Sequence, residues 1–296
     1  MEKCVYALGN FDGVHKGHYA VIKSAIDIAR ELGIKAKALT FEPHPREVLN
    51  PSGEPFRLTS FDQKRRLILS IGMDDVVKVD FSAHTANMSA EEFVRSLAST
   101  TAHIVAGHDF AFGKGRSGNM STLAKIAETM EIGVTEVPAL LGDGEALSST
   151  KIRDLLKAGL PEQAAWILGR PWRVCGIVIK GAERGRQIGI RTANIELGRF
   201  LRPKFGVYAI KAYRAGEDMP ISGVANIGVR PTFTGSTENL EAHLFDFNED
   251  IYGQEWEFEF IKFLRPELKF AGLEDLRCQI EADIVAAKRA LIPSDQ

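Results

Sequence analysis

His15 and His18 stand three residues apart in a glycine-rich segment near the start of the chain, LGNFDGVHKGH. The segment follows a short apolar run, expected as a strand, and opens a run of apolar residues at helical spacing. A helix N-terminus presents free N–H groups and positive partial charge to an anion, and Gly9, Gly13 and Gly17 let the backbone approach it. Two imidazoles on one face of the first helical turn can stabilise charge on a transferring phosphoryl oxygen. The segment therefore predicts a phosphate-binding site.

Two other interpretations of the histidine pair are less favoured. The histidines can be polar surface groups on an ordinary capped helix, but the strand–turn–helix context is the one that phosphate-binding motifs require. A zinc site needs a third protein ligand and an open position. No partner with suitable spacing stands out in the sequence.

A second candidate is the segment LSSTKIRDLL, which reads as the start of a helix. Ser148, Ser149 and Thr150 offer hydroxyl groups there, while Lys151 and Arg153 add positive charge within the first turn. Cations at a helix N-terminus oppose the helix dipole, and a bound polyphosphate would resolve that conflict. From the residues alone, an ordinary N-cap explains the pattern equally well.

A third candidate lies at 181–197, GAERGRQIGIRTANIEL. Its glycines and neighbouring N–H groups can cradle a phosphate. Thr192 and Asn194, two residues apart, project from one side of an extended segment and offer the oxygen ligands that Mg²⁺ prefers. From these residues alone, a glycine-rich β-turn with polar surface residues is the simpler interpretation.

The elements that must position these residues change type along the chain. In the first half, apolar runs at 4–9, 35–41, 75–81, 103–107 and 133–138 alternate with helical patterns, which predicts βαβ units and a parallel sheet. Ser60 with Gln63 and Ser89 with Glu92 form capping-box patterns. Beyond about residue 170, the runs 172–180, 206–213, 220–228, 239–247 and 255–264 are rich in Val, Ile, Tyr and Phe. They predict an antiparallel barrel or sandwich, closed by a helix at 273–291. The predicted domains are 1–169 and 170–296.

Composition narrows the class of protein. The 296 residues are 45% hydrophobic and 26% charged, with a net charge of −2, as in ordinary globular chains. A nucleic-acid-binding protein usually carries a basic excess, so nucleic acid is not an expected partner. Three widely spaced cysteines, Cys4, Cys175 and Cys278, indicate a reduced protein. With no signal peptide and no apolar stretch near the ~20 residues of a membrane span, we expect a cytoplasmic protein without membrane contact. GKGRSG at 113–118 does not directly join a strand to a helix, so it is not expected to bind a dinucleotide.

These motifs coincide with the HxGH and SSTxIR signatures of nucleotidylyl transferases, and together they resemble the bacterial bifunctional riboflavin kinase/FMN adenylyltransferase (FAD synthetase) family. FEPHPREVL, RLTSFDQKRRLI, AGHDFAFGKGRSG, GVANIGVRPTF and LEAHLFDFNEDIYG match that family too. The kinase module of the family typically reads Gly-Phe-Pro-Thr-Ala-Asn where this chain reads Gly-Ile-Arg-Thr-Ala-Asn at 189–194. The resemblance covers nearly the full length.

The resemblance implies a Rossmann-like nucleotidylyltransferase domain followed by a β-barrel riboflavin kinase domain with a terminal helix. It implies catalytic roles for His15, His18 and Glu241, the last as the general base. It further implies ATP and phosphate contacts from Gly9, Asn10, Phe11, Asp12, Gly17, Ser149, Thr150, Arg153, Gly185, Arg186 and Gly189. Flavin contacts are implied for Phe41, His44, Pro45, Asp109 and Phe112, and Mg²⁺ ligation for Thr192 and Asn194.

The implied reactions convert riboflavin and ATP to FMN, and FMN and ATP to FAD with release of pyrophosphate. An alternative is an FMN adenylyltransferase whose kinase module only binds flavin, because Arg191 replaces the family's proline. A flavin-binding regulator without catalysis is a further alternative, against which the retained His15, His18, Thr192, Asn194 and Glu241 speak. The sequence does not predict the oligomeric state.

Overall fold

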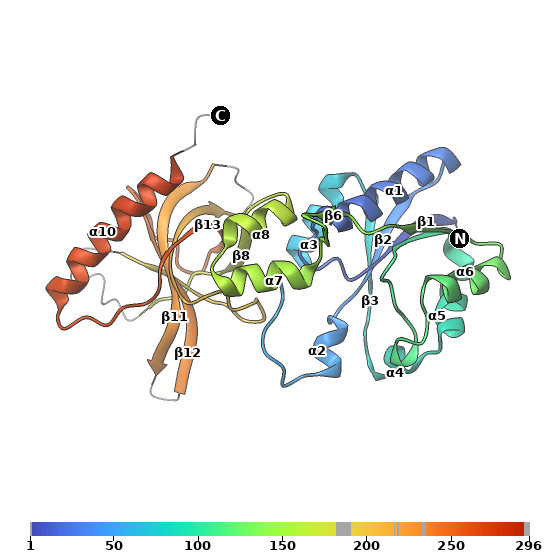
Figure 1. Ribbon diagram of the computed structural model, residues 1–296, viewed down its shortest axis with the longest axis horizontal. Coiled ribbons are helices and arrows are strands. Elements are labelled where there is room, and N and C mark those ends of the chain that lie inside the picture. Colours follow the sequence, from blue (N-terminus) through green and yellow to red (C-terminus); the bar gives the residue numbers. More distant parts are fainter. Residues whose placement is uncertain (1, 182–190, 216, 218, 233–234, 293–296) are drawn as a thin grey trace. The chain divides into compact units, whose positions relative to one another are not determined.

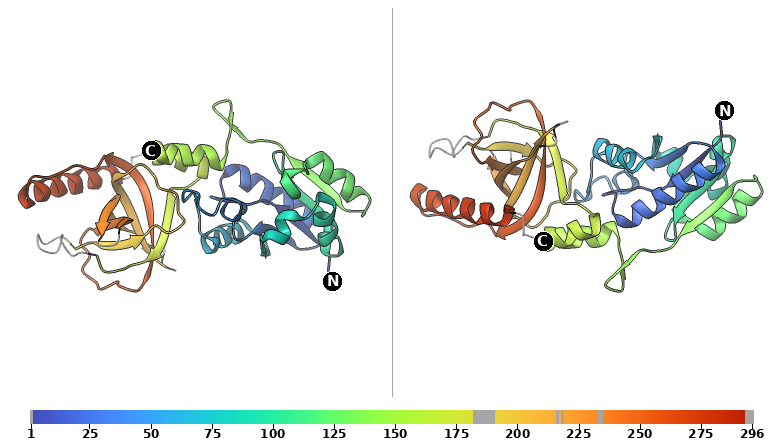
Figure 2. Two further views of the ribbon diagram at one scale, coloured as in Figure 1. Left: turned by 90° about the horizontal axis from the view of Figure 1, so that it is seen from below. Right: turned by 90° about the horizontal axis from the view of Figure 1, so that it is seen from above.

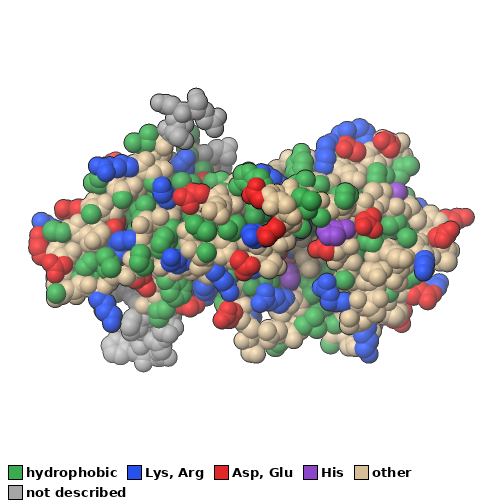
Figure 3. Space-filling view, in the orientation of Figure 1, with side chains coloured by type: hydrophobic (Ala, Val, Ile, Leu, Met, Phe, Trp, Pro, Cys, Tyr) green, Lys and Arg blue, Asp and Glu red, His purple; other side chains and the backbone are tan. Residues whose placement is uncertain are grey.

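The computed structural model describes residues 2–181, 191–215, 217, 219–232 and 235–292 (Figure 1). Contacts divide the chain into two compact units. The first comprises Met1–Glu54 and Ser60–Ser148, and the second comprises Pro55–Thr59 and Ser149–Gln296. Acidic and basic side chains are interspersed over the face shown in Figure 3. In the part of the chain described, none of the helices has the length and apolar character that crossing a membrane requires.

The first unit contains a five-stranded parallel sheet in the order β3-β2-β1-β4-β5, which confirms the predicted α/β class. Its strands are β1 (Cys4–Leu8), β2 (Ala36–Phe41), β3 (Asp75–Val79), β4 (Thr101–Gly107) and β5 (Gly133–Val137). The chain runs outward from β1 to β3 and then returns to β4 on the other side of β1. Ligands of open parallel sheets bind at such a switch point, beyond the carboxyl ends of the strands. The turn that carries His15 and His18 follows β1 and lies there.

Helices cover both faces of this sheet (Figure 2). Val5 and Ala7 of β1 pack in a core cluster with Ile22 of α1, whereas Tyr6 and Leu8 pack with Phe93 of α5 in a second cluster. The helices of the first unit are α1 (Lys16–Leu32), α2 (Pro45–Leu49), α3 (Phe61–Ile71), α4 (Ala83–Asn87), α5 (Ala90–Leu97) and α6 (Met120–Glu128). Two short strands, β6 (Leu141–Gly142) and β7 (Glu145–Ala146), form a hairpin. The central strand β1 is buried along its whole length, as expected of a parallel sheet covered on both faces.

Local helix signals in the sequence are confirmed. The Ser60 hydroxyl accepts from the Gln63 N–H at 3.2 Å, and the Gln63 amide accepts from the Ser60 N–H at 3.1 Å. Ser89 and Glu92 make the same reciprocal box at the start of α5. Gly33 ends α1 with a left-handed φ of 67°.

The second unit contains a six-stranded antiparallel sheet in the order β8-β13-β10-β11-β12-β9. The strands are β8 (Trp172–Ile177), β9 (Ala193–Glu196), β10 (Gly206–Arg214), β11 (Ile221–Thr232), β12 (Gly235–Leu244) and β13 (Glu255–Arg265). A bridge between Ile179 and Asn194 links the two edges, so the sheet closes on itself as a small barrel. This confirms the predicted barrel. The sequence did not predict β9, which is four residues long.

Large apolar side chains fill the barrel, and one helix covers its outside. Trp172, Tyr208 and Phe260 are at most 2% exposed, with ring centroids 5.0 Å and 5.1 Å from Phe260. The helix α10 (Leu273–Leu291) lies along the outer face, where Ala287 packs in a cluster with Val207 of β10 (Figures 1 and 2). The predicted terminal helix is therefore confirmed.

Two helices that the sequence analysis assigned to the first domain belong by contact to the second unit: α7 (Ser149–Ala158) and α8 (Pro161–Leu168). The Leu156 carbonyl of α7 accepts from the Lys204 N–H at 3.0 Å, and α8 contacts β8 and β13. The predicted domain boundary at 169/170 stays a prediction about where the two functional modules meet. As a packing unit, the barrel also includes residues 149–169 and Pro55–Thr59.

A truncation experiment tests this packing. A fragment of residues 149–296 is expected to melt at a higher temperature than a fragment of 170–296, by roughly 5 °C or more. The physical reason is that α7 and α8 bury apolar residues such as Ile152 and Leu156, which are at most 1% exposed. Thermal unfolding followed by circular dichroism measures the difference. Equal melting temperatures would show that α7 and α8 do not stabilise the barrel.

Candidate active sites

The turn between β1 and α1 has an unusual backbone. Phe11 and Val14 have left-handed φ angles of 49° and 42°, and Gly13 has a φ of 88°. For Phe and Val this region is sterically unfavourable, so the surrounding contacts must impose it. Phe11 and Val14 are buried, at 1% and 4% exposed, and the Val14 N–H donates to the Phe11 carbonyl at 3.1 Å. Burial of two apolar side chains therefore fixes the turn.

His15 caps α1. Its Nδ1 accepts from the N–H groups of Gly17 and His18 at 3.1 Å and 3.3 Å, and Nδ1 of His18 accepts from the His15 N–H at 3.4 Å. A ring nitrogen that accepts carries no proton, so the proton of each neutral imidazole lies on Nε2. The rings stack with centroids 3.6 Å apart. The cap thus makes each ring an Nε2–H donor, which suits binding of phosphate oxygens.

Gly17 is required by close packing in the first helical turn. A Cβ at this position would lie 3.0 Å from Cε1 of His15 and 3.5 Å from the Leu147 carbonyl oxygen. Leu147 immediately precedes the segment SSTKIR. A Cβ at Gly9 would lie 2.9 Å from the ring of Phe11, and that ring packs edge-on against His18 at 5.4 Å. Gly17 therefore makes room for the His15 ring, and Gly9 makes room for the Phe11 ring that packs against His18.

The other residues predicted at this turn differ in exposure. Asn10 is exposed, and Asp12 is buried at 4% exposed. Ser149, Thr150 and Arg153 lie in the first turns of α7, in the second unit. There the Arg153 Nε donates to the Phe56 carbonyl at 2.9 Å. Their predicted role in binding the ATP phosphates stays a prediction.

The residues predicted to border the flavin lie in three places: in the aromatic cluster around Phe93, at the start of α2, and beyond the end of β4. Phe41 and Phe112 both contact Phe93, with centroids 5.9 Å and 5.6 Å away, but Phe112 is a core residue at 5% exposed. His44 caps α2 by accepting from the Arg46 N–H at 3.1 Å, and Pro45 is the first residue of that helix. Asp109 is exposed beyond β4. Residues 113–118 follow Phe112, whose N–H and carbonyl both pair with Gly118, so this glycine run is a closed loop.

In the second unit, the pairing of three adjacent strands aligns three polar residues in one row across the sheet. Two of them, Asn194 and Glu241, were predicted as site residues. Asn194 of β9 lies directly opposite Glu241 of β12, which in turn lies opposite Asn226 of β11. Directly opposed residues of antiparallel strands share a face, with Cβ atoms about 4.5–5.5 Å apart. Thr192 precedes Asn194 by two residues and is on the same side of the extended segment. Asn194 and Glu241 are therefore neighbours, with Thr192 two residues before Asn194, and their predicted roles stay predictions.

Asn194 has an unsatisfied oxygen. The residue is 1% exposed, and its Oδ1 is buried without a hydrogen-bond partner among the described residues. Gly181 packs on the same amide, because a Cβ there would lie 2.2 Å from Nδ2. A buried acceptor without a donor is unfavourable, by about 1–3 kcal/mol, and a bound cation would satisfy it. With the Thr192 hydroxyl and the Glu241 carboxylate on the same face, the donors are oxygens, which fit a hard divalent cation.

Thr192, Asn194 and Gly181 border a pocket of about 170 Å³, whose lining residues do not include Glu241. Its lining also includes the loop residues 249–252. The pocket also contains Arg191, at the position where the family typically has proline. Gly185, Arg186 and Gly189, which were predicted to bind phosphate, lie outside the described residues.

Arg191 and His243 tie the predicted metal-binding segment to its surroundings. The Arg191 guanidinium donates to the Asn248 carbonyl at 3.1 Å, and the Arg191 carbonyl accepts from Nδ1 of His243 at 2.8 Å. Because a carbonyl only accepts, Nδ1 of His243 carries the proton. The sequence analysis did not single out His243. Its signal was its position two residues after Glu241 on the same face of a strand.

Two family models match this chain, one over each half. Residues 1–151 match the family described as FAD synthetase, and residues 168–291 match the family described as riboflavin kinase. The fold and the two sites thus define a two-module enzyme class acting on flavins and nucleotides. The chain belongs to the bifunctional riboflavin kinase/FMN adenylyltransferase family.

The full-length relatives support that assignment. A bifunctional riboflavin kinase/FMN adenylyltransferase of Listeria monocytogenes is 40% identical over 284 residues, covering 94% of this chain and 90% of that protein. One of Escherichia coli K12 is 36% identical over 290 residues, covering 97% of this chain and 92% of that protein. A crystal structure from Streptococcus pneumoniae, described as a macrolide-efflux protein, has a TM-score of 0.85 at 30% identity and covers 97% of this chain and 94% of that one.

His18→Ala tests the phosphate-binding turn. We expect FAD formation from FMN and ATP to fall by about a hundredfold or more, the usual loss when a transition-state donor is removed. Phosphorylation of riboflavin, assayed in the same preparation, should be unchanged. FAD formation at the wild-type rate would contradict the assignment.

A matched pair at His15 separates capping from chemistry. His15→Asn keeps an acceptor near the position of Nδ1 but removes the Nε2–H donor, so stability should be retained while FAD formation falls. His15→Ala should lose FAD formation and also about 0.5–2 kcal/mol of stability, the usual effect of losing an N-cap. Chemical denaturation with a flavin assay measures both quantities. Equal FAD formation by wild type and His15→Asn would show that the ring acts only as a cap.

Proposed function

We propose that the second unit transfers the γ-phosphoryl group of ATP to riboflavin, giving FMN and ADP, and that the first joins FMN to the AMP part of ATP, giving FAD and pyrophosphate. The observation that carries the proposal is the strand register that places Asn194 opposite Glu241. This register places a proposed metal ligand, Asn194, beside the proposed general base, Glu241. Both residues lie in the second unit, where Arg191 replaces the family's proline and had raised doubt about kinase activity.

In the kinase reaction, Glu241 acts as the general base. The 5′-hydroxyl of riboflavin is a weak nucleophile until a positioned carboxylate accepts its proton. The hydroxyl oxygen then bonds to the γ-phosphorus while the bond from that phosphorus to the β–γ bridging oxygen breaks, releasing ADP. Thr192 and Asn194 would hold a divalent cation, proposed as Mg²⁺, which when bound neutralises phosphate charge.

In the adenylyl transfer, a phosphate oxygen of FMN attacks the α-phosphorus of ATP and pyrophosphate leaves. This nucleophile is already anionic near neutral pH, so the reaction needs positioning and charge stabilisation more than a base. The Nε2–H groups of His15 and His18 supply donors to the phosphate oxygens. Ser149, Thr150 and Arg153 are proposed to bind the triphosphate. The residues proposed to border the flavin are Phe41, His44, Pro45, Asp109 and Phe112.

The alternative of an adenylyltransferase with a kinase module that only binds flavin is not supported. The riboflavin kinase family matches residues 168–291, and the curated relatives that align over nearly the whole chain are bifunctional. We further propose that the protein acts in the cytoplasm, where the free thiols of Cys4, Cys175 and Cys278 would be expected to persist.

A time course tests the whole proposal. Purified protein is incubated with riboflavin, ATP and Mg²⁺, and the flavins are separated by chromatography. FMN should accumulate first and FAD should follow, and supplied FMN should give FAD with one pyrophosphate for each FAD. Removal of divalent cations with a chelator should stop both reactions. FAD formation from FMN without any phosphorylation of riboflavin would support the alternative.

Glu241→Gln tests the general base. The change keeps the shape of the side chain and removes its basicity, so kinase turnover should fall roughly a hundredfold to ten-thousandfold. FAD formation from supplied FMN should be unaffected. Glu238→Gln is the matched control: it lies on the same strand but on the other face, where Glu238 pairs with Arg202. Equal kinase rates in wild type and Glu241→Gln would exclude Glu241 as the base.

Arg191→Pro tests the departure from the family pattern. Proline would fix φ near −65° but would remove the guanidinium that donates to Asn248. We expect a lower kinase rate and a higher KM for ATP. Arg191→Lys keeps the charge and should lose less. A higher kinase rate in Arg191→Pro would show instead that the arginine is a weakened form of the family segment.

A further inference from the structure

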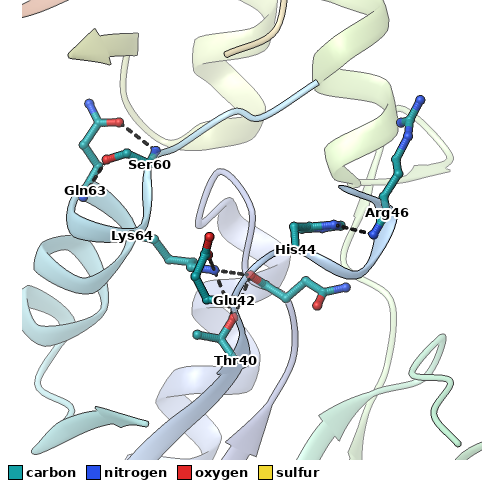
Figure 4. A network of polar contacts seen from close by, with 8 residues as sticks. Thr40, Glu42, His44, Arg46, Ser60, Gln63 and Lys64 are labelled. Carbon is teal, nitrogen blue, oxygen red and sulfur yellow. Dashed lines mark hydrogen bonds and ion pairs between the residues drawn. The ribbon is translucent and has the colours of Figure 1, made fainter. Parts of the chain in front are cut away.

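Lys64 is a buried lysine in the first unit that the reactions above do not use. It lies in the first turns of α3, and its side chain is 1% exposed. Burial of an ammonium group is unfavourable unless hydrogen bonds and an opposite charge compensate it. Nζ donates to the Asn10 carbonyl at 3.1 Å and to the Thr40 hydroxyl at 3.0 Å, and it lies 3.9 Å from a Glu42 carboxylate oxygen (Figure 4).

The three partners belong to two different segments of the proposed adenylyl-transfer site. Asn10 begins the turn that leads to His15 and His18. Thr40 lies at the carboxyl end of β2, and Glu42 follows it in the segment that leads to His44. One ammonium group therefore joins the turn proposed to bind ATP phosphates to the segment proposed to border the flavin.

The Asn10 carbonyl is held from two sides. It accepts from Lys64 and also from the Thr40 hydroxyl, at 3.1 Å. Both lone pairs of that oxygen are thus used, at the residue directly before the left-handed Phe11. A backbone that its own φ preferences disfavour needs such fixed contacts to persist.

We propose that Lys64 is a positioning residue for adenylyl transfer. It fixes the distance between the phosphate-binding turn and the segment 40–44, so that FMN and the α-phosphorus of ATP are held in attack geometry. Lys64 contacts neither substrate in this proposal and transfers no proton. The inference rests on the proposed function of the first unit.

Lys64→Met in the full chain tests the proposal. Methionine keeps the apolar length of the side chain but removes the charge and the donors. We expect kcat/KM for FAD formation from FMN and ATP to fall about a hundredfold, the loss that a misplacement of about 1 Å can produce. The KM values for FMN and for ATP should both rise, because both segments are released. The rate of riboflavin phosphorylation in the same preparation should stay within about twofold of wild type.

Lys78→Met is the matched control. Both lysines lie near the ring of Phe61: Nζ of Lys78 is 5.5 Å and Nζ of Lys64 is 5.7 Å from the ring centroid. Lys78, however, belongs to β3. It should leave FAD formation unchanged. Lys64→Met removes a donor from the Asn10 carbonyl and a positive charge from beside Glu42, and removing one partner of a buried pair is destabilising, so the variant should melt below the wild-type temperature. The rate of riboflavin phosphorylation in the same preparation therefore separates a positioning effect from a general loss of folded protein.

Thr40→Val is a second variant that tests the same proposal, and it can be used if Lys64→Met does not fold. It removes the hydroxyl shared by Asn10 and Lys64, and should lower kcat/KM for FAD formation about tenfold. The double variant should lose little more than Lys64→Met alone, because both changes release the same carbonyl. Wild-type kcat/KM in Lys64→Met or in Thr40→Val, or a fall matched by an equal loss of kinase rate, would overturn the proposal. If wild-type protein forms no FAD, the proposed function fails instead.

Discussion

The hydrogen bonds from the backbone of α1 to the imidazole of His15 are the interaction on which the first site depends. Ser, Thr, Asp or Asn usually caps a helix, and here a proposed catalytic side chain does so. These capping bonds fix the orientation of the His15 ring, its tautomer and its distance from the His18 ring. The chain enters α1 through the turn from Phe11 to Val14, where both of these residues have left-handed φ angles. The buried side chains of Phe11 and Val14 and the hydrogen bonds to the Asn10 carbonyl hold that turn.

The second site depends on strand pairing in the same way. Register in an antiparallel sheet decides which side chains share a face, and a slip of one residue would move Asn194 away from Glu241. Hydrogen bonds at Arg191 add to that constraint. A proline restricts the backbone through its own ring, whereas Arg191 is held through its guanidinium and its carbonyl. Two different chemical means can therefore keep the same segment extended.

Features that depend on neighbouring residues were predictable from the sequence, and features that depend on distant pairing were not. The boxes at Ser60 and Ser89 and the alternating strands of the first unit follow from local patterns. The four-residue β9 has no apolar run of its own and is a strand only because β12 pairs with it. α7 was assigned to the first domain because the contacts of its Leu156 with Lys204 are invisible in sequence.

The two proposed reactions differ in their nucleophile, and the two sites differ accordingly. A neutral hydroxyl must lose a proton, so the kinase site needs a carboxylate such as Glu241 within reach of the oxygens of Thr192 and Asn194. An anionic phosphate needs no base but repels the triphosphate that it attacks, so the other site needs donors. Imidazoles locked as Nε2–H donors meet that need, and the capping bonds that lock them come from the backbone of α1 itself. The chemistry of each nucleophile therefore accounts for the kind of side chain that each fold holds in place.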